Sequence, residues 1–134
     1  MKIPNILIIG DNGSDKELIK YFLVQFMNID TAFVSSINSK SYNFDNCNDY
    51  GIIFISYLSS KTVKAISKFI NRLIIQNPHS LIIMWASSVY NNTGINSGAH
   101  LKIDSSICLH KTITSPLKEQ AAQISNLIRL INSI

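Results

Sequence analysis

Three polar side chains that follow apolar runs of the sequence differ in chemistry: one is a carboxylate, one a hydroxyl and one an ammonium group. Asp11, Ser56 and Lys111 each lie within two residues of the end of such a run. A carboxylate can hold Mg²⁺, a hydroxyl becomes a nucleophile when a base activates it, and an ammonium group can pair with a phosphoryl group. These side chains can act together only if the strands that precede them end at the same edge of one sheet.

Five short segments have the composition of β-strands. Most of them are continuous apolar runs rich in branched residues, which is typical of strands buried on both faces. The predicted strands are 6–9, 32–34, 52–55, 81–86 and 107–110. The polar stretch 36–49 predicts at most a weak helix, and 87–102 is polar and interrupted by glycines, so any helix there is short.

Amphipathic helices are predicted between these segments. The first spans 14–27, with apolar residues at helical spacing on one side and charged residues on the other. The second begins with a cap at Ser59 or Ser60 and ends before Pro78. The last opens with Pro116 at its first helical position. Its apolar stripe consists of Leu117, Ala121, Ile124, Ile128 and Ile131, widened by Leu127, Leu130 and Ile134.

The alternation of strands and helices predicts a single α/β domain over residues 1–134. Parallel strands joined by right-handed crossovers place helices on both faces of their sheet. We therefore expect a doubly wound, flavodoxin-like sheet of five parallel strands. In such a sheet ligands bind outside the carboxyl ends of the strands, which is where Asp11, Ser56 and Lys111 are expected.

Composition limits the classes of function. The chain has 134 residues, of which 46% are hydrophobic and 15% charged, as in a folded domain rather than a disordered one. Its apolar runs are too short to cross a membrane, its N-terminus has no secretory signal, and Cys47 and Cys108 are too few for a disulfide framework. We therefore expect a cytoplasmic protein without membrane contact. The net charge of +4 comes from basic residues spread singly along the chain, so no nucleic-acid partner is expected.

The residues after the predicted strands resemble those of the receiver domain of bacterial two-component response regulators. In that family two adjacent acidic residues follow the first strand, and here Gly10 stands at the first position and Asp11 at the second. The aspartate that accepts phosphate from a histidine kinase follows the third strand, and Ser56 stands at that position. The interval from Asp11 to Ser56 fits the family's spacing, and the resemblance covers nearly the whole chain.

The later strands resemble the family less completely. The threonine or serine that contacts the phosphoryl group after the fourth strand corresponds to Trp85, Ala86 or Ser87, and the sequence leaves all three open. Lys111 matches the lysine that follows the fifth strand of receivers. Thr112 stands in place of the proline that comes after that lysine.

The resemblance implies a domain that has lost its phosphorylation chemistry. Phosphoryl transfer to an aspartate requires a carboxylate nucleophile and an Mg²⁺ ion held by neighbouring carboxylates. Ser56 supplies no carboxylate and Gly10 removes another. Asp11 is then the one acid left of three, and it is expected to pair with Lys111. We therefore expect a degenerate receiver with no metal, no cofactor and no enzymatic activity.

Two other kinds of site are weaker matches. A serine nucleophile would need a Ser-His-Asp arrangement. The histidines show neither that arrangement nor a paired metal-ligand spacing: His79, His100 and His110. The turn 10–14 could hold an anion on backbone amides at a helix N-terminus, but it has no glycine-rich phosphate signature. The alternative function is therefore a small-ligand-binding protein that takes a nucleotide or flavin at its strand ends.

The expected function is that of a pseudo-receiver, a non-catalytic signalling module in a two-component or phosphorelay context. It would act through protein contacts without aspartyl phosphorylation, and its partner would be a sensor kinase, a regulator or a second copy of the chain. In receivers the fourth helix, fifth strand and fifth helix form the usual contact face. The candidate interface residues are Leu127, Leu130 and Ile134, which either form a homodimer contact or pack against a neighbouring helix.

Overall fold

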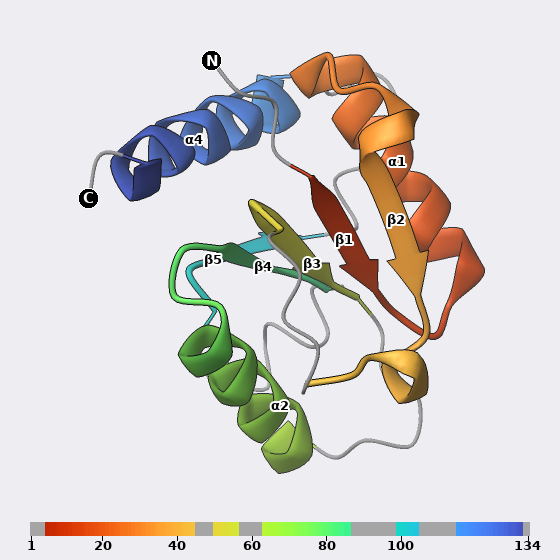
Figure 1. Cartoon of the computed structure of the whole chain (residues 1–134). Helices are drawn as coiled ribbons and strands as arrows, with labels where there is room; N and C mark the ends of the chain where they lie inside the picture. The colour runs from red at the N-terminus through yellow and green to blue at the C-terminus, as the bar shows by residue number, and fades with distance from the viewer. Residues whose placement is uncertain (1–4, 45–49, 57–62, 87–98, 105–114, 133–134) are drawn as a thin grey trace.

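The computed structural model describes residues 5–44, 50–56, 63–86, 99–104 and 115–132. Within these ranges the chain forms one parallel sheet (Figure 1). Its strands are β1 (Ile6–Ile9), β2 (Val34–Ile37), β3 (Ile52–Ile55), β4 (Leu81–Ala86) and β5 (Leu101–Asp104). Their order across the sheet is β2-β1-β3-β4-β5, and every neighbouring pair is parallel.

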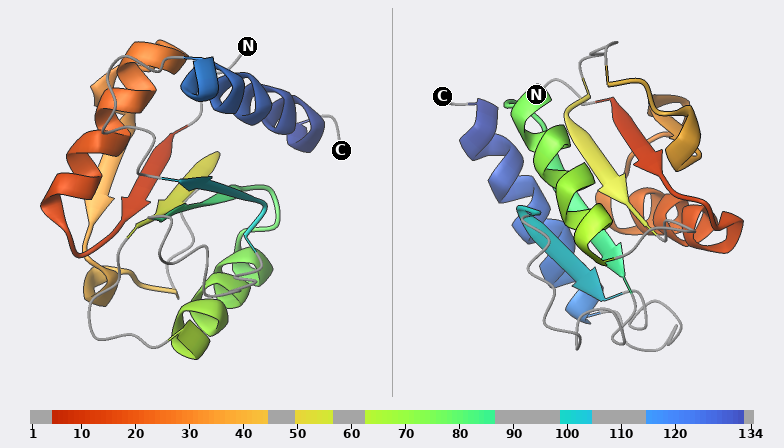
Figure 2. Two further views of the ribbon diagram at one scale, coloured as in Figure 1. Left: turned by 180° about the vertical axis from the view of Figure 1, so that it is seen from behind. Right: turned by 90° about the horizontal axis from the view of Figure 1, so that it is seen from below.

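Helices cover both faces of this sheet. Those of the described ranges are α1 (Gly13–Met27), α2 (Val63–Gln76) and α4 (Ser115–Asn132). Helices α1 and α4 lie on one face and α2 lies on the other (Figures 1 and 2). Strand side chains alternate between the two faces. Ile8 and Phe54 belong to the cluster with α1 and α4, whereas Ile9 and Ile55 belong to the cluster with α2. The predicted parallel α/β architecture is therefore confirmed.

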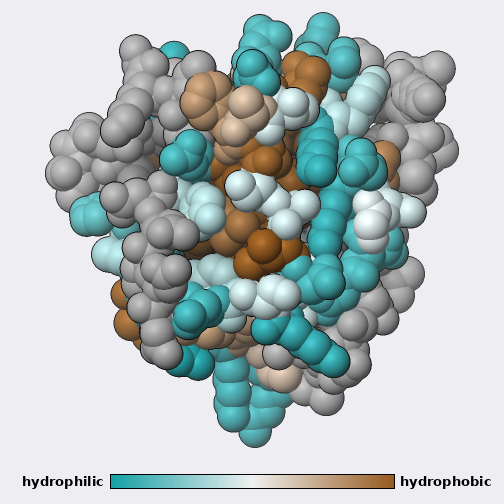
Figure 3. Space-filling model, turned by 45° about the vertical axis from the view of Figure 1, so that its right-hand side comes forward, coloured by the Kyte–Doolittle hydropathy of each residue, from teal (hydrophilic) through white to brown (hydrophobic). Residues whose placement is uncertain are grey.

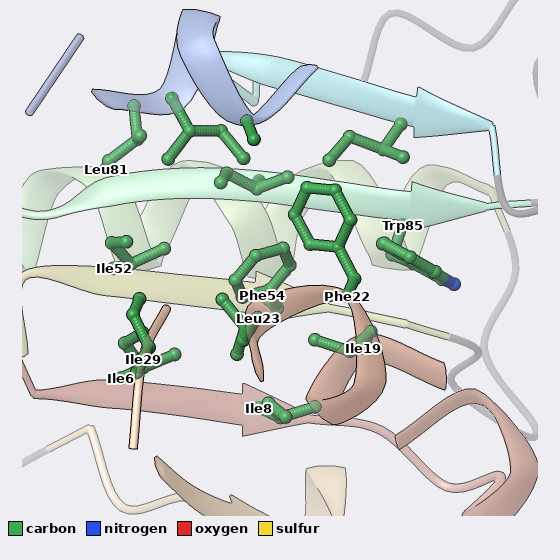
Figure 4. Packing of buried hydrophobic residues seen from close by; sticks show 14 residues of the cluster. Ile6, Ile8, Ile19, Phe22, Leu23, Ile29, Ile52, Phe54, Leu81 and Trp85 are labelled. Atoms are coloured by element: carbon green, nitrogen blue, oxygen red, sulfur yellow. The ribbon is translucent and has the colours of Figure 1, made fainter. Parts of the chain in front are cut away.

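The central strands are buried on both faces. Every side chain of β1 and β3 is at most 2% exposed, because packed layers cover both sides of the sheet there. Trp85 on β4 is fully buried, and its ring meets Phe22 and Phe54 edge-on, with ring centroids 5.7 and 6.3 Å away (Figure 4). This aromatic group joins β3 and β4 to α1 near the carboxyl ends of the strands.

Helix α1 has sharp ends because flanking asparagines satisfy its terminal backbone groups. The Asn12 side-chain oxygen accepts a hydrogen bond from the Ser14 amide at 2.9 Å. Asn28 ends the helix in the left-handed region, with φ of 53°, and its amide donates to the Leu23 carbonyl. The helix spans the predicted 14–27 and begins one residue earlier.

Strand β2 occupies Val34–Ile37, and the predicted position at 32–34 is wrong. The Asp30 side chain accepts a hydrogen bond from the Ala32 amide at 3.0 Å and caps a short 3₁₀ turn over Thr31–Phe33. This local bond competes with strand formation. Because β2 is at the edge of the sheet, its two central serines are exposed and its sequence carries no apolar run.

The segment that pairs with β4 is also different from the predicted one. β5 lies at Leu101–Asp104, within and beyond the stretch 87–102 that was expected to be a polar loop or short helix. The predicted strand 107–110 lies outside the described residues. Ile103 is fully buried, but a strand at the edge of a sheet does not need an apolar residue at every position. In β5 apolar and charged residues alternate, so the strand lacks the continuous apolar run by which inner strands are recognised.

The other two helices agree with the prediction at the one limit of each that the described residues test. α2 ends at Gln76, before Pro78 as predicted, and its predicted cap at Ser59 or Ser60 lies outside the described residues. α4 has Pro116 as its second residue, close to the predicted first helical position. Within the described ranges, no helix combines the length and the hydrophobicity that crossing a bilayer demands.

Few large apolar side chains reach the surface of the described chain. They are Tyr21, Val24, Phe33 and Ile75. Residues of high hydropathy are visible at the centre of one face, with hydrophilic residues beside them (Figure 3). Singly exposed apolar residues are normal on protein surfaces. Ile75 on α2 stands out among them because it is 78% exposed.

Candidate functional site

The carboxyl ends of the central strands β1 and β3 lie side by side. Hydrogen bonds continue one residue beyond the strands. The Ser56 amide donates to the Ile9 carbonyl at 2.9 Å, and the Gly10 amide donates to the Ile37 carbonyl at 3.0 Å. Gly10 and Ser56 are therefore held at adjacent strand ends, as the parallel topology requires.

Ser56 presents a hydroxyl that is buried and unpaired. The residue is 1% exposed, and its Oγ has no hydrogen-bond partner in the described structure. A serine becomes a nucleophile when a base in contact with its hydroxyl removes the proton. The Ser56 hydroxyl has no such contact among the described residues and is closed off from solvent, so this geometry does not activate it.

Asp11 is engaged by the segment that follows β2. Its Oδ1 accepts a hydrogen bond from the Ser39 amide and its Oδ2 accepts one from the Ser39 hydroxyl, both at 2.8 Å. Ser39 is buried and begins the short 3₁₀ turn Ser39–Ser41. Hydrogen bonds to an ionised acceptor are short and strong. Asp11 thus ties the end of β1 to the end of β2.

A second contact reinforces this tie. The Lys16 ammonium, in the first part of α1, donates to the Asn38 side-chain oxygen at 2.7 Å. The turn after β2 is therefore joined to the turn after β1 through Ser39 and to the start of α1 through Asn38. The sequence prediction missed both, because it ended the second strand at residue 34. The polar pair that directly follows the true strand is the signal that would have found them.

The described residues do not fit a divalent-cation site. Mg²⁺ in proteins is held through carboxylate and phosphate oxygens in octahedral geometry. Both oxygens of Asp11 already accept bonds from Ser39, and the neighbouring strand-end positions are Gly10 and Ser56, which carry no charge. No group of three His, Cys, Asp or Glu side chains suited to a metal ion occurs in the described ranges.

Trp85 carries a second unpaired polar atom near this edge. The residue is 1% exposed, and its indole Nε1 has no hydrogen-bond partner among the described residues. The nitrogen points away from Phe22 and toward the carboxyl ends of the strands (Figure 4). The unpaired atoms of Ser56 and Trp85 thus belong to the ends of the neighbouring strands β3 and β4. A buried polar group without a partner carries an uncompensated desolvation cost.

The remaining candidate residues divide into described and undescribed ones. Leu127 is half-buried and packs against the core cluster of α1, α4 and the sheet. Leu130 lies in α4, and Ala86 is the last residue of β4. His79 is exposed. The residues outside the described ranges are Cys47, Ser87, Cys108, His110, Lys111, Thr112 and Ile134. The pair of Asp11 with Lys111 therefore stays a prediction.

We expect Ser56→Ala to leave the free energy of unfolding unchanged or to raise it by up to about 1 kcal/mol, because it removes a buried hydroxyl that has no partner. Urea denaturation of the two proteins measures the difference. Ser39→Ala is the matched control, since it removes a hydroxyl that does donate to Asp11 and should destabilise the chain. A clear loss of stability in the Ser56 variant would mean that its hydroxyl has a partner after all.

His100 extends the pairing of β5 with β4. Its amide donates to the Ile82 carbonyl, and its Nδ1 accepts a hydrogen bond from the Ile82 amide, both at 3.0 Å. The ring nitrogen thus takes the place that a backbone carbonyl has in a parallel ladder. Only a neutral imidazole can accept this bond. Desolvation by burial also lowers the pKa of His100 below its usual 6.5.

We expect the chain to lose stability as the pH falls below about 6.5, the pKa of an unfolded-state histidine. A lowered folded-state pKa means that folding favours the neutral ring. The stabilisation is therefore complete above the unfolded pKa and is lost as the pH falls through the folded one. Melting temperatures at a series of pH values from neutral to mildly acidic measure the effect. His100→Asn keeps an acceptor that does not titrate, so the melting temperature of this variant should depend less on pH. If it falls with pH as steeply as that of the wild type, the assignment is contradicted.

No family model matches the chain, and no curated protein sequence matches it either. Solved structures are similar to it. One is a response regulator receiver domain protein from Clostridium thermocellum, with a TM-score of 0.54, 16% identity and 95% of each chain covered. Another is described as an adenylate cyclase from Rhodopirellula baltica, with a TM-score of 0.52, 13% identity, and 98% of this chain and 100% of that chain covered. At such identities the likeness shows the fold, which is that of receiver domains.

Proposed function

We propose that this chain, which has the fold of a receiver domain, is a pseudo-receiver that signals through protein contacts without aspartyl phosphorylation. The observation that carries the proposal is Ser56, a buried and unpaired hydroxyl at the strand end where receivers carry the phosphoacceptor aspartate. Gly10 stands where a neighbouring acid would be needed. The carboxylate of Asp11 is engaged by Ser39 rather than offered to a metal ion.

The same contacts support a module with one conformation. A phosphoryl group switches a protein only if it binds two conformations with different affinity. Here the bonds of Asp11 to Ser39 join the two turns that border the strand ends, and the bond of Lys16 to Asn38 joins α1 to the second of them. The proposed module is a single domain over residues 1–134 that works in the cytoplasm, in a two-component or phosphorelay context. Its partner is a sensor kinase, a regulator or a second copy.

The last helix is the first candidate for the contact surface. A homodimer through α4 would use Leu127, Leu130 and Ile134. Leu127 already packs against the core, so it offers a contact only through its exposed part.

Incubation with Mg²⁺ and acetyl phosphate tests the proposal directly. Intact-mass spectrometry is expected to show no phosphorylated species of the wild-type chain, and beryllofluoride is expected to leave the Trp85 fluorescence unchanged. The double variant Gly10→Asp with Ser56→Asp, which restores two carboxylates to the strand ends, is the matched comparison. Stoichiometric phosphorylation of the wild-type chain would overturn the proposal.

A second candidate function is binding of a small ligand, such as a nucleotide or flavin, at the strand ends. The observation that favours it is the pair of buried, unpaired polar atoms, Ser56 Oγ and Trp85 Nε1. A ligand at 100 times its Kd stabilises a protein by about 2.7 kcal/mol. Thermal-shift measurements with nucleotides and flavins are expected to show no such shift if the pseudo-receiver proposal is right, and a clear shift would favour the ligand-binding function.

A further inference from the structure

Helix α2 carries three basic side chains on one face, which we call the basic stripe: Lys64, Lys68 and Arg72. All three are exposed. Because each is four residues from the next, their Cα atoms lie about 6 Å apart along the helix axis and project from the same side. The opposite side of the helix is buried against the sheet through Ile66, Phe69, Ile70 and Leu73. The stripe therefore faces away from the body of the domain.

No acidic side chain of the described ranges neutralises the basic stripe. Helix α2 contains no acidic residue. None of the acidic side chains in the described ranges forms an ion pair with the stripe, whereas Lys20 on α1 pairs with Glu17 at 3.6 Å. Like charges four residues apart repel one another, and Lys64 lies in the first turn, where the helix dipole disfavours a cation. This arrangement opposes the stability of the helix that carries it.

Two neighbouring features make the stripe a better binding surface. The guanidinium carbon of Arg72 lies 4.1 Å from the centroid of the Phe44 ring, and Phe44 packs edge-on against Phe69 at 5.1 Å. Stacking holds Arg72 in place, so less side-chain freedom is lost when it binds a partner. Three residues further along lies Ile75, which is 78% exposed. The stripe thus ends beside an apolar side chain that the fold does not cover.

We infer that the basic stripe is the docking surface for an acidic amphipathic helix of a protein partner. Carboxylates repeated every four residues along that helix would face Lys64, Lys68 and Arg72, and an apolar side chain would cover Ile75. This is the helix-on-surface mode of recognition, with charge pairs that set register. The inference rests on the proposed function in that the partner is a protein. It places the contact on the face of the sheet opposite α4 (Figures 1 and 2).

The chemistry of the stripe favours an acidic helix over other polyanions. Affinity for a nucleic acid rises with the number of phosphates that a protein neutralises, about 6–10 in a strongly salt-dependent complex, and this stripe offers three cations. A helix that lies in a membrane interface buries its apolar face among lipid chains. The apolar face of α2 already packs on the sheet, and Ile75 alone cannot replace it. Three cations in a straight row with one apolar neighbour match a single helix face.

The test uses the whole chain and a fluorescein-labelled helical peptide. Its glutamates stand at every fourth position on one face, with a leucine three residues beyond each end of the row, so that it fits α2 in either direction. Anisotropy titrations at low salt are expected to show binding that weakens steeply as salt screens the charges. Lys64→Glu with Lys68→Glu is expected to weaken binding about tenfold or more, and Ile75→Ser by about threefold.

The matched control is Lys118→Glu with Arg129→Glu on α4, where both side chains are exposed. It changes the net charge by the same amount and is expected to leave peptide binding within about twofold of the wild type, since distant exposed charges are screened. The α2 variant should remain folded, because it turns the repulsion between positions 68 and 72 into attraction and places an acid near the helix N-terminus. Circular dichroism melts verify this for both variants.

Three results would overturn the inference. One is equal loss of binding in the α2 and α4 variants, which would reduce the effect to net charge. Another is equal affinity for a peptide of the same composition whose glutamates are spread over all faces. The third is tighter, stripe-dependent binding to double-stranded RNA or to phosphatidylserine vesicles. None of these results bears on phosphorylation by acetyl phosphate, so failure of the docking surface and failure of the pseudo-receiver proposal are separate outcomes.

Discussion

Trp85→Ala is expected to lower the free energy of unfolding by about 3–5 kcal/mol, enough to unfold a substantial share of a marginally stable domain. The indole is fully buried and fills the space between β3, β4 and α1 (Figure 4). Its removal deletes the edge-on contacts with Phe22 and Phe54 and leaves a cavity at the carboxyl edge of the sheet. Chemical denaturation followed by far-ultraviolet circular dichroism measures the loss.

Trp85→Phe separates the two properties of this side chain. Phenylalanine keeps an aromatic ring against Phe22 and removes an indole N–H that has no acceptor among the described residues. The smaller ring loses some packing, but the unpaired donor is gone, so the variant should cost much less than the alanine one. If both variants destabilise the chain equally, the indole nitrogen has a partner in solution, and the ligand-binding alternative gains support.

Asp11→Ala is expected to cost about 2–3 kcal/mol, because two hydrogen bonds to a charged acceptor are lost and the buried Ser39 amide and hydroxyl are left unpaired. The turn after β2 should loosen from the turn after β1. Hydrogen exchange of the Ser39 amide reports that loosening separately from global stability. An unchanged exchange rate at Ser39 would show that Asp11 does not hold the two turns together.

A double-mutant cycle makes this prediction specific. Asp11→Ala, Ser39→Ala and the double variant are expected to be strongly non-additive, because both substitutions remove the bond between Asp11 Oδ2 and Ser39 Oγ. Additive effects would place the energetic role of the carboxylate elsewhere. The cycle also separates the pseudo-receiver proposal from a cryptic metal site. In a metal site Mg²⁺ would compete with Ser39, and added Mg²⁺ would reduce the measured coupling.

The inner strands were predictable because their environment leaves a local mark. β1, β3 and β4 pack between two layers, so nearly every position must be apolar, and their observed bounds coincide with the predicted runs. Edge strands have no such requirement. β2 was misplaced because Asp30 caps a 3₁₀ turn that takes up Ala32, and β5 because its apolar and charged residues alternate.

The basic stripe on α2 was missed for a different reason. Along the sequence the basic residues are spread singly, which argued against a nucleic-acid partner. The spacing of four between Lys64, Lys68 and Arg72 already indicates one helix face once a helix is predicted there. What the spacing could not show is that Phe44, far away in the sequence, lies under Arg72.

The sequence by itself determined the parallel α/β architecture and, to within one residue, the limits of α1, because apolar periodicity and capping residues are local properties of the chain. Tertiary structure alone decided that Asp11 binds Ser39 and that the polar atoms of Ser56 and Trp85 stay unpaired within the described chain. Whether a polar atom finds a partner depends on which distant segments lie beside it. That depends on strand order and register, which no local pattern encodes.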